Sequence, residues 1–300
     1  RTGDTSQRVR KRQLTEPPDL LLTTPETLAQ ILSLPEWHGN LRSLQTVVVD
    51  EIHAFAGDKR GADLACSLER LERLTASSLQ RVGLSATCRP LDRVAEFLVG
   101  ADRPCVVAAI PDRSRKEFVI EPLGDPLDDS PAWLSAALDR IDEELEANTA
   151  TLIFANTRRL AERIAWGLRR RHPRRTDDIA VHHSSLSAAR RRSVERRMKQ
   201  GKLWAVVSSA SLELGIDIGA VDSVVCLDPP GGVIRLLQRI GRSGHRPDAV
   251  RRGVLLMHSA SDLIETIVTA DGGEAGLMEP LNLVCQPFDV LCQQIVGMAM

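Results

Sequence analysis

The sequence contains no tyrosine, and its five phenylalanines and four tryptophans make up only 3% of 300 residues. Stacking platforms for nucleobases are therefore scarce, so any nucleic acid would be held mainly through its phosphates. There is no apolar run of about 18 residues and no charged-then-apolar leader, which argues against a membrane span and a signal peptide. The six cysteines include no C-x-x-C pair. We therefore expect reduced core thiols in a cytoplasmic protein, with neither a zinc site nor disulfides.

Net charge is also nearly absent, because 39 basic and 40 acidic residues almost cancel. Their distribution is uneven, however, since the segment from Arg158 to Lys202 holds 15 Arg or Lys residues against 4 Asp or Glu. Such a segment can face phosphates, although a solvated pair of helices has the same composition. With 43% apolar residues, the chain can bury a large core and is long enough for about two domains.

Short β-branched runs alternate with helical patterns, which predicts an α/β fold with parallel sheets covered by helices. The predicted strands are 20–23, 46–50, 81–85, 151–154, 179–182, 204–208, 221–227 and 253–257. The predicted helices are 64–74, 132–148, 158–171, 187–200 and 233–241. We expect the first lobe to be incomplete, because no strand, Gly-rich loop and helix precede Leu20.

These patterns predict four segments along the chain. Residues 1–105 form part of a first lobe, 106–131 a Pro- and Asp-rich link, 132–272 a second lobe and 273–300 the beginning of a helical module. The boundary before the last module rests on Asp271-Gly272-Gly273, which is interpreted as a turn.

An acidic pair, Asp50-Glu51, ends the apolar run 46–49. A carboxylate at the carboxyl end of a buried strand faces the crevice where α/β sheets bind ligands. Asp50 can therefore hold the Mg²⁺ ion of ATP, and Glu51 can polarise an attacking water. The hydroxyl residues of Ser85-Ala86-Thr87, after the next strand, can hydrogen-bond this pair. A surface acidic pair that caps a loop is the alternative interpretation.

A basic motif, Gln238-Arg239-Ile240-Gly241-Arg242, follows almost two hundred residues later. A planar, permanently charged guanidinium suits the charge that develops on a transferred phosphoryl group. The alternative for Arg242 is a surface salt bridge.

Taken in order, these motifs resemble motifs II, III, V and VI of superfamily 2 helicases. The resemblance rests on Asp50 to His53, on Ser85 to Thr87, on 208–217 and on 238–242. Five segments are similar to the large helicase-related (Lhr) group of that superfamily: 2–5, 23–28, 57–61, 212–217 and 287–291. The last of these is similar to the entry into the winged-helix domain of that group.

The resemblance implies two RecA-like lobes that close on ATP and Mg²⁺ and move along single-stranded nucleic acid, with DNA preferred to RNA. The implied protein is an ATP-dependent helicase or translocase with a role in DNA repair. Arg242 would be the arginine finger, and His245 stands where many members carry a second arginine.

The resemblance also assigns roles to individual residues. The implied catalytic residues are Asp50, Glu51, Gln238, Arg239 and Arg242, with Asp50 and Glu51 at the metal. The implied ATP contacts are Ser209, Gly215 and Asp217, and the implied coupling residues are His53, Ser85 and Thr87. The implied nucleic-acid contacts are Gly3, Asp4, Thr24, Pro25, Glu26, Asn156, Thr157, Arg158, Ser184 and Ser185.

The chain contains no G-x-x-x-x-G-K-[ST] sequence, so it has no Walker A lysine for the β and γ phosphates. We therefore expect the 300-residue chain to be inactive alone, while the full-length protein hydrolyses ATP. Two alternatives stay open: a non-catalytic nucleic-acid-binding remnant, and an RNA-directed helicase of the same superfamily. The motifs do not predict an oligomeric state.

Overall fold

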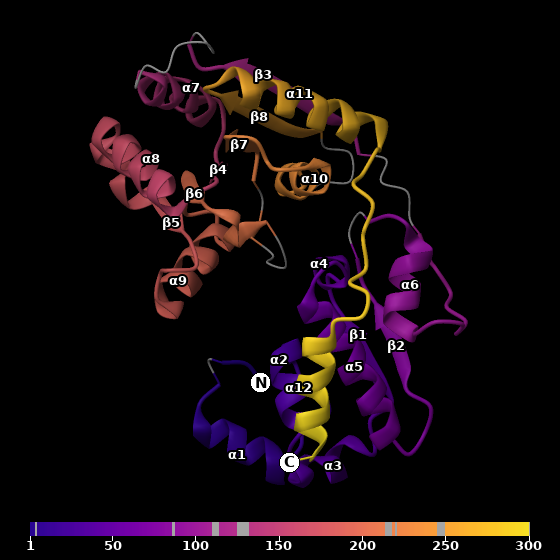
Figure 1. Cartoon of the computed structure of the whole chain (residues 1–300). Helices are drawn as coiled ribbons and strands as arrows, with labels where there is room; N and C mark the ends of the chain where they lie inside the picture. The colour runs from indigo at the N-terminus through magenta and orange to yellow at the C-terminus, as the bar shows by residue number, and fades with distance from the viewer. Residues whose placement is uncertain are drawn as a thin grey trace. The chain divides into compact units, whose positions relative to one another are not determined.

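The computed structural model describes residues 1–3, 5–85, 88–109, 114–124, 132–213, 218–219, 221–244 and 250–299. The chain forms two compact units (Figure 1). Unit 1 consists of Arg1–Ala109 and Pro280–Met300, and unit 2 consists of Ile110–Glu279. Each unit has a parallel sheet and surrounding helices, which is the α/β class that the sequence predicts.

The sheet of unit 1 pairs β1 (Thr46–Val49) with β2 (Gln80–Gly83) in parallel, with Val49 opposite Gly83. Between them run α4 (His53–Ala56) and α5 (Lys59–Leu74). Helix α5 buries Leu64 and Leu68 against this sheet, as the apolar spacing predicts. The other helices of unit 1 are α1 (Gln7–Thr15), α2 (Pro25–Leu32), α3 (Pro35–Leu41), α6 (Leu91–Val99) and α12 (Phe288–Ala299).

The predicted strand at 20–23 is wrong, because these residues belong to no strand of the structure. Leu20 and Leu22 are 76% and 75% exposed, so their side chains do not enter a core. The Thr23 hydroxyl donates a 2.9 Å hydrogen bond to the carbonyl of Arg1. The segment therefore lies beside the amino-terminal residues rather than in the sheet.

Unit 2 contains a six-stranded parallel sheet in the order β3-β8-β7-β4-β6-β5. Its strands are β3 (Lys116–Pro122), β4 (Thr151–Ala155), β5 (Ile179–His182), β6 (Ala205–Ser208), β7 (Ser223–Leu227) and β8 (Arg251–Met257). Its helices are α7 (Trp133–Ala147), α8 (Arg158–Arg171), η1 (Pro173–Asp178), α9 (Ala188–Lys199), η2 (Ala210–Leu212), α10 (Val233–Ile240) and α11 (Ala260–Ala275).

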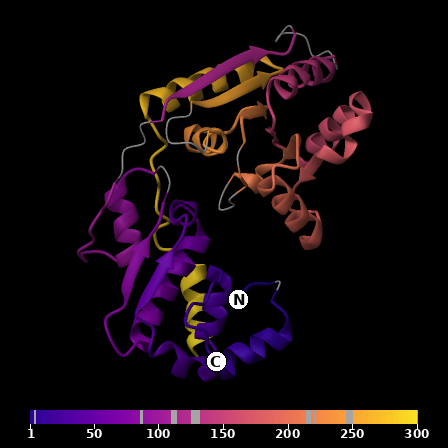
Figure 2. The same cartoon turned by 180° about the vertical axis from the view of Figure 1, so that it is seen from behind.

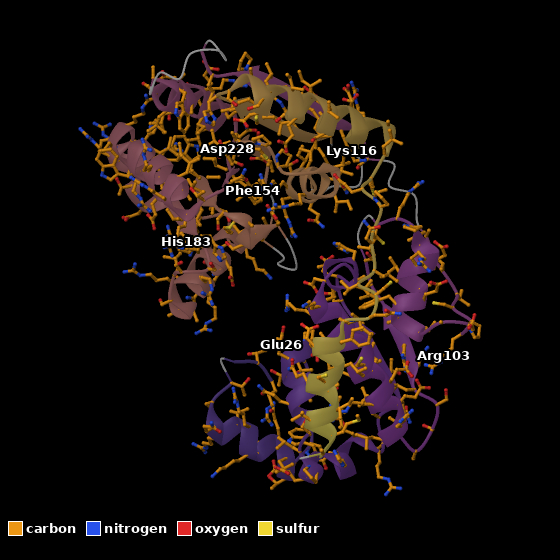
Figure 3. All side chains as sticks on the ribbon, viewed as in Figure 1. Glu26, Arg103, Lys116, Phe154, His183 and Asp228 are labelled. Carbon is orange, nitrogen blue, oxygen red and sulfur yellow. The ribbon has the colours of Figure 1, made fainter. Side chains whose placement is uncertain are left out.

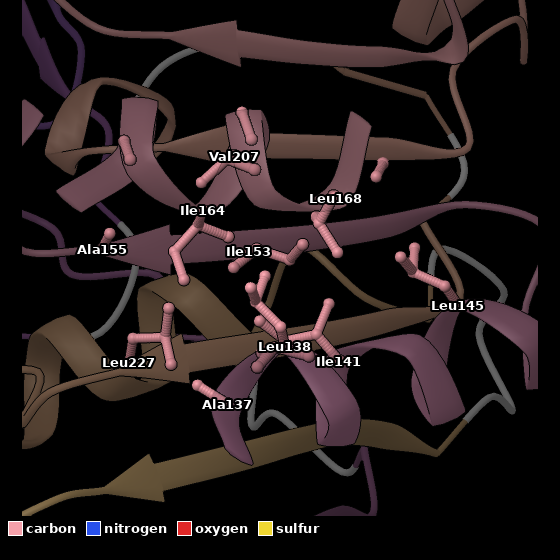
Figure 4. Close-up of a cluster of buried hydrophobic side chains, with 14 of the residues drawn as sticks. Ala137, Leu138, Ile141, Leu145, Ile153, Ala155, Ile164, Leu168, Val207 and Leu227 are labelled. Carbon is pink, nitrogen blue, oxygen red and sulfur yellow. The ribbon is translucent and has the colours of Figure 1, made fainter. Parts of the chain in front are cut away.

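Alternate residues of these buried strands supply two separate cores. Ile153 and Val207 face α7 and α8, where they join Ile141 and Ile164 (Figure 4). Side chains of the opposite face, such as Leu152, pack with residues of α9, α10 and α11. Helices α7 and α8 therefore cover one face of the sheet, and α9, α10 and α11 pack on the other face; Figure 2 shows this unit from behind.

Two elements lie where the sequence predicts a link and a turn. Residues 116–122 of the predicted link form β3, which pairs with β8 along its whole length. Gly272 and Gly273 lie inside α11 instead of forming a turn. A Cβ atom on Gly272 would lie 2.9 Å from Val233 Cγ2, so this glycine allows α10 and α11 to approach closely.

The prediction of core thiols is correct for two cysteines and wrong for three. Cys88 and Cys226 are buried, and burial raises the pKa of the Cys226 thiol to about 11 although Arg239 acts in the opposite direction. Cys105, Cys285 and Cys292 are exposed, because the apolar runs around them lie partly at the surface. All six cysteines are free thiols, and none of the described helices is long and apolar enough to cross a membrane.

Candidate nucleotide and nucleic-acid site

The acidic pair of unit 1 follows β1 directly, at a sharp change of backbone direction. Asp50 is exposed, and its Oδ1 accepts a 2.9 Å hydrogen bond from the backbone N–H of Glu51. Glu51 has a φ of +49°, a left-handed conformation that is uncommon for a residue with a Cβ atom. The turn returns the chain to the sheet, where Ile52 N–H donates to the carbonyl of Leu84 at 3.0 Å.

His53 connects the acidic pair to the end of β2. Its Nδ1 lies 2.8 Å from the hydroxyl of Ser85, which itself donates to Cys88 Sγ at 3.2 Å. Burial lowers the pKa of the His53 imidazole below its usual value, although the nearby Glu51 and Asp50 carboxylates act in the opposite direction. The structure thus brings together Asp50, Glu51, His53 and Ser85, whereas Thr87 lies outside the described residues.

Glu51 has a carboxylate oxygen that fits a hydrated metal ion. Its Oε2 is buried and accepts no hydrogen bond from the described residues, and it lies 3.6 Å from His53 Nδ1. A buried acceptor without a donor is costly unless a water or ligand satisfies it. The described residues contain no cluster of three metal-binding side chains. Mg²⁺ bound with a nucleotide needs only one or two carboxylates beside phosphates and waters, so the pair fits this ion.

The amino-terminal segments of unit 1 that were predicted to contact nucleic acid lie beside one another. Arg10 holds the carbonyls of Thr2 and Gly3 at 3.1 and 3.3 Å, and Arg1 accepts the hydrogen bond from Thr23. Asp4 lies outside the described residues. These contacts place Gly3 and the start of α2 in one region of unit 1.

Helix α2 begins with the predicted contacts Thr24, Pro25 and Glu26. Thr24 is its N-cap and accepts from Thr27 N–H, while Pro25 occupies the first turn. Glu26 pairs with Arg60 at 2.8 Å. Partial burial raises the pKa of Glu26, but hydrogen bonds from the backbone and from Arg60 outweigh it and keep that pKa below its ordinary value. The Glu26 carboxylate is therefore paired with the Arg60 guanidinium at the start of α2.

In unit 2, the predicted nucleic-acid contacts gather at the carboxyl ends of β4 and β5. Asn156, Thr157 and Arg158 follow β4, and Thr157 caps α8 by accepting from Leu160 N–H at 3.1 Å. Ser184 and Ser185 follow β5 and are exposed. Arg158 Nη1 donates to Ser185 Oγ at 2.9 Å, which joins the two groups. Exposed hydroxyls, a guanidinium and a helix N-terminus can hold phosphates without reading sequence.

The two histidines next to these serines have separate partners. His182 Nε2 lies 3.1 Å from Glu195, and His183 Nε2 lies 3.0 Å from Glu162. Adjacent residues at a strand end point to opposite sides, so the pair does not form a metal site.

The segment after β6 carries Ser209, which was predicted to contact ATP. Ser209 N–H donates to the carbonyl of His182 at 3.2 Å, so its position is set by β5. Gly215 and Asp217 lie outside the described residues. The neighbouring Glu213 is 5% exposed and is the centre of a charged network.

Arg239 lies in the interior of unit 2. It is 1% exposed, its Nε donates to Glu213 Oε1 at 2.8 Å, and its Nη2 donates to Asn156 Oδ1 at 3.0 Å. Its guanidinium also lies over the ring of Phe154, 5.2 Å from the centroid. These contacts make Arg239 a positioning residue that joins the segments after β4 and β6 to α10.

Arg242 follows α10 and is partly exposed. Its Nη2 donates to the backbone carbonyl of Glu213 at 2.6 Å. Gln238 is partly buried on the same helix. The basic motif and the segment after β6 are thus held together by both the side chain and the backbone of Glu213.

Sequence reasoning assigned no role to Glu213, Phe154 or Asp228, although all three lie at or near this edge of the sheet. Phe154 and Asp228 are labelled in Figure 3. Asp228 has a φ of +72°, and burial raises the pKa of its carboxyl group even though His258 opposes this effect. An acidic residue within the motif 208–217 was the available signal for Glu213, because a buried arginine requires a carboxylate.

Known protein families match both units. Residues 1–94 match the DEAD/DEAH box helicase family, and residues 134–246 match the helicase conserved C-terminal domain. An ATP-dependent helicase Lhr-Core protein 2 of Thermococcus barophilus is 43% identical over the whole chain, which covers 36% of that protein. A Lhr helicase/probable uracil glycosylase of Mycolicibacterium smegmatis is 38% identical over the whole chain, which covers 22% of that protein.

The chain belongs to the Lhr group of superfamily 2 helicases. A solved structure of the Mycobacterium smegmatis helicase Lhr bound to ssDNA and AMP-PNP superimposes on the whole chain with a TM-score of 0.92 and 40% identity. The chain covers 39% of that Lhr protein. This likeness confirms the predicted RecA-like fold class.

Proposed function

We propose that the full-length Lhr protein couples ATP hydrolysis to movement along single-stranded DNA. The observation that carries this proposal is the match of the entire chain to a Lhr helicase that was solved with ssDNA and AMP-PNP. The chain spans about a third of the length of its archaeal relatives, so the activity is proposed for the whole protein. The carboxylates of Asp50 and Glu51 in unit 1 and the guanidinium of Arg242 in unit 2 are residue types that support ATP hydrolysis.

In this proposal, Asp50 holds Mg²⁺ and Glu51 orients the attacking water through its unsatisfied Oε2. When bound, Mg²⁺ neutralises charge on the phosphates. Ser85, at the neighbouring strand end, holds His53, whose Nδ1 lies 3.6 Å from the Glu51 carboxylate. Arg242 acts as the arginine finger, and Arg239 positions it through Glu213. Gln238 couples the nucleotide to the nucleic acid, and Ser209, Gly215 and Asp217 contact ATP.

Single-stranded DNA would contact Gly3, Asp4 and the start of α2 in unit 1, and Asn156, Thr157, Arg158, Ser184 and Ser185 in unit 2. These residues offer hydroxyls, helix N-termini and one arginine but no aromatic platform. Binding through phosphates is therefore strongly salt-dependent and weakly dependent on sequence.

The test is the ATPase rate of the full-length protein with single-stranded DNA, with RNA of the same sequence and with neither. The proposal expects stimulation by DNA that exceeds stimulation by RNA. Equal or greater stimulation by RNA would favour an RNA helicase, and no stimulation by either strand would refute the proposal. The Glu51→Gln variant should bind DNA normally and hydrolyse ATP at least about a hundredfold more slowly.

The 300-residue chain alone should bind nucleic acid without hydrolysing ATP, because it contains no Walker A sequence. Measurable, DNA-dependent ATP turnover by this chain would contradict this expectation.

A further inference from the structure

A basic cavity lies in unit 2 at the amino-terminal ends of the strands, whereas the predicted nucleic-acid contacts lie at their carboxyl ends. Its volume is about 1140 Å³. Asn148 and Thr149 precede β4, Asp178 precedes β5, and Trp204 precedes β6, so the cavity lies at the amino-terminal ends of these strands. Residues 156–158 and 184–185 follow the carboxyl ends of β4 and β5, so the length of a strand separates them from the cavity.

Four cations line the cavity: Arg174, Arg175, Arg197 and Lys202. Its carboxylates are Glu146 and Asp178, so the lining has a positive excess. Arg174 and Lys202 are exposed and form no ion pair with any carboxylate of the described residues. Exposed cations that no carboxylate neutralises favour an anionic ligand.

Trp204 gives this cavity a fixed wall. Its side chain is 8% exposed, and its Nε1 donates to the carbonyl of Leu145 at 2.8 Å. The guanidinium of Arg175 lies over this ring, 4.3 Å from the centroid. Stacking uses the face of the guanidinium and leaves its N–H edge for a ligand, which is the geometry of arginines that bind phosphate.

Helix α9 joins the cavity to the predicted nucleic-acid contacts. Near its start, Arg191 donates to the carbonyl of Ser184 at 3.0 Å, and at its end Arg197 lines the cavity. Its 12 residues span about 18 Å. Arg190 and Arg197 are two turns apart and therefore lie on the same side of this helix. Basic side chains thus lie near both ends of α9.

We propose that this cavity is a second phosphodiester-binding site, which holds the duplex part of a substrate whose single-stranded part lies at the carboxyl edge. The inference rests on the proposed nucleic-acid function and adds a second contact to it. Three of the four cations are arginines, whose planar forks suit phosphate oxygens. A polymer with regularly spaced charges fits a basic surface that extends along a helix better than a single small anion does.

The test compares two DNA ligands by fluorescence anisotropy with the 300-residue chain: a single-stranded tail, and the same tail joined to a duplex. The variant R174Q/K202Q should bind the tail as the parent does and bind the tailed duplex more weakly. Loss of two phosphate contacts lowers the slope of log K against log salt by about 1.8, which corresponds to as much as about 60-fold at 0.1 M salt. Unchanged binding of the tail also shows that the variant is folded.

The matched control is R42Q/R73Q, which removes two exposed cations from unit 1. This control should leave the affinities for both ligands unchanged. An unchanged salt slope for R174Q/K202Q on the tailed duplex would overturn this inference and leave the proposed function intact. So would displacement of the tailed duplex from the parent by polyglutamate at equal charge concentration, because an acidic protein segment would then be the better ligand. Failure of the parent to bind either DNA would overturn the proposed function as well.

Discussion

Replacing Glu213 by alanine should destabilise unit 2 more than any surface charge change. The Glu213 carboxylate is 7% exposed and pairs with Arg239, which is 1% exposed, at 2.7 Å. It also pairs with the half-exposed Arg235 at 3.2 Å. The alanine variant would leave the Arg239 guanidinium buried without its carboxylate, although the hydrogen bond to Asn156 Oδ1 would remain.

The expected loss follows from the burial of both partners. Removal of one partner from a buried ion pair costs about 3–5 kcal/mol, whereas the exposed pair with Arg235 adds less than about 1 kcal/mol. Domains of this size have unfolding free energies of about 5–15 kcal/mol. The variant should therefore lose a large fraction of the stability of unit 2, which corresponds to a urea midpoint lower by roughly 1–2 M.

The assay is urea unfolding of the chain, followed by tryptophan fluorescence. Three of the four tryptophans, Trp133, Trp166 and Trp204, belong to unit 2 and report on it. The matched control is Glu143→Ala, since Glu143 is 71% exposed and lies 3.5 Å from Arg140. This control should change the unfolding free energy by less than about 0.5 kcal/mol.

A second variant separates burial of charge from loss of packing. Glu213→Leu combined with Arg239→Met removes both charges, so it should recover much of the stability that Glu213→Ala loses. A change of less than about 1 kcal/mol for Glu213→Ala would refute the reasoning, because the network would then contribute no more than an exposed pair.

Two further predictions concern unit 1. Burial lowers the pKa of His53, so the folded state resists protonation and the unfolding free energy should fall as the pH drops below about 6.5 toward the lowered pKa. The His53→Gln variant should show a smaller change in unfolding free energy between pH 7.5 and 5.5. An equal pH dependence in both proteins would contradict this prediction. A Cβ atom on Gly61 would lie 2.0 Å from the carbonyl oxygen of Phe55, whereas one on Gly39 would meet nothing within 4 Å. Thermal unfolding should therefore show Gly61→Ala destabilised by about 1–3 kcal/mol and Gly39→Ala stabilised by up to about 1 kcal/mol, and equal effects would argue against the packing of α4 on α5.

The sequence predicts the elements whose apolar residues are locally continuous. Strands such as β4 and β5 are buried on both faces and appear as unbroken apolar runs, so their bounds agree with the structure within about one residue. Strand β3 is an edge strand of the sheet and was not predicted, because charged residues flank its only three consecutive apolar residues and the surrounding segment is rich in Pro and Asp. The run 20–23 has strand composition, but strand pairing depends on neighbours that local composition does not reveal.

The candidate site shows the same division. The resemblance to superfamily 2 helicases implied that Asn156, Arg158 and Ser185 line one track. The structure brings Arg158 and Ser185 into contact, because both follow the carboxyl ends of parallel strands. The resemblance did not predict that Arg239 is buried against Glu213, since the burial of a charged side chain depends on long-range packing. The basic cavity includes residues from four separate segments, so the charge count alone did not reveal it.

The most direct test of the account is the DNA-stimulated ATPase rate of the full-length protein carrying Arg242→Ala, Glu51→Gln or both. If the carboxylates after β1 and the arginine after α10 serve the same nucleotide, Arg242→Ala should lower kcat by about a thousandfold or more and Glu51→Gln by at least about a hundredfold, and the double variant should be little slower than the slower single variant. An Arg242→Ala protein that hydrolyses ATP at the parental rate would contradict the account.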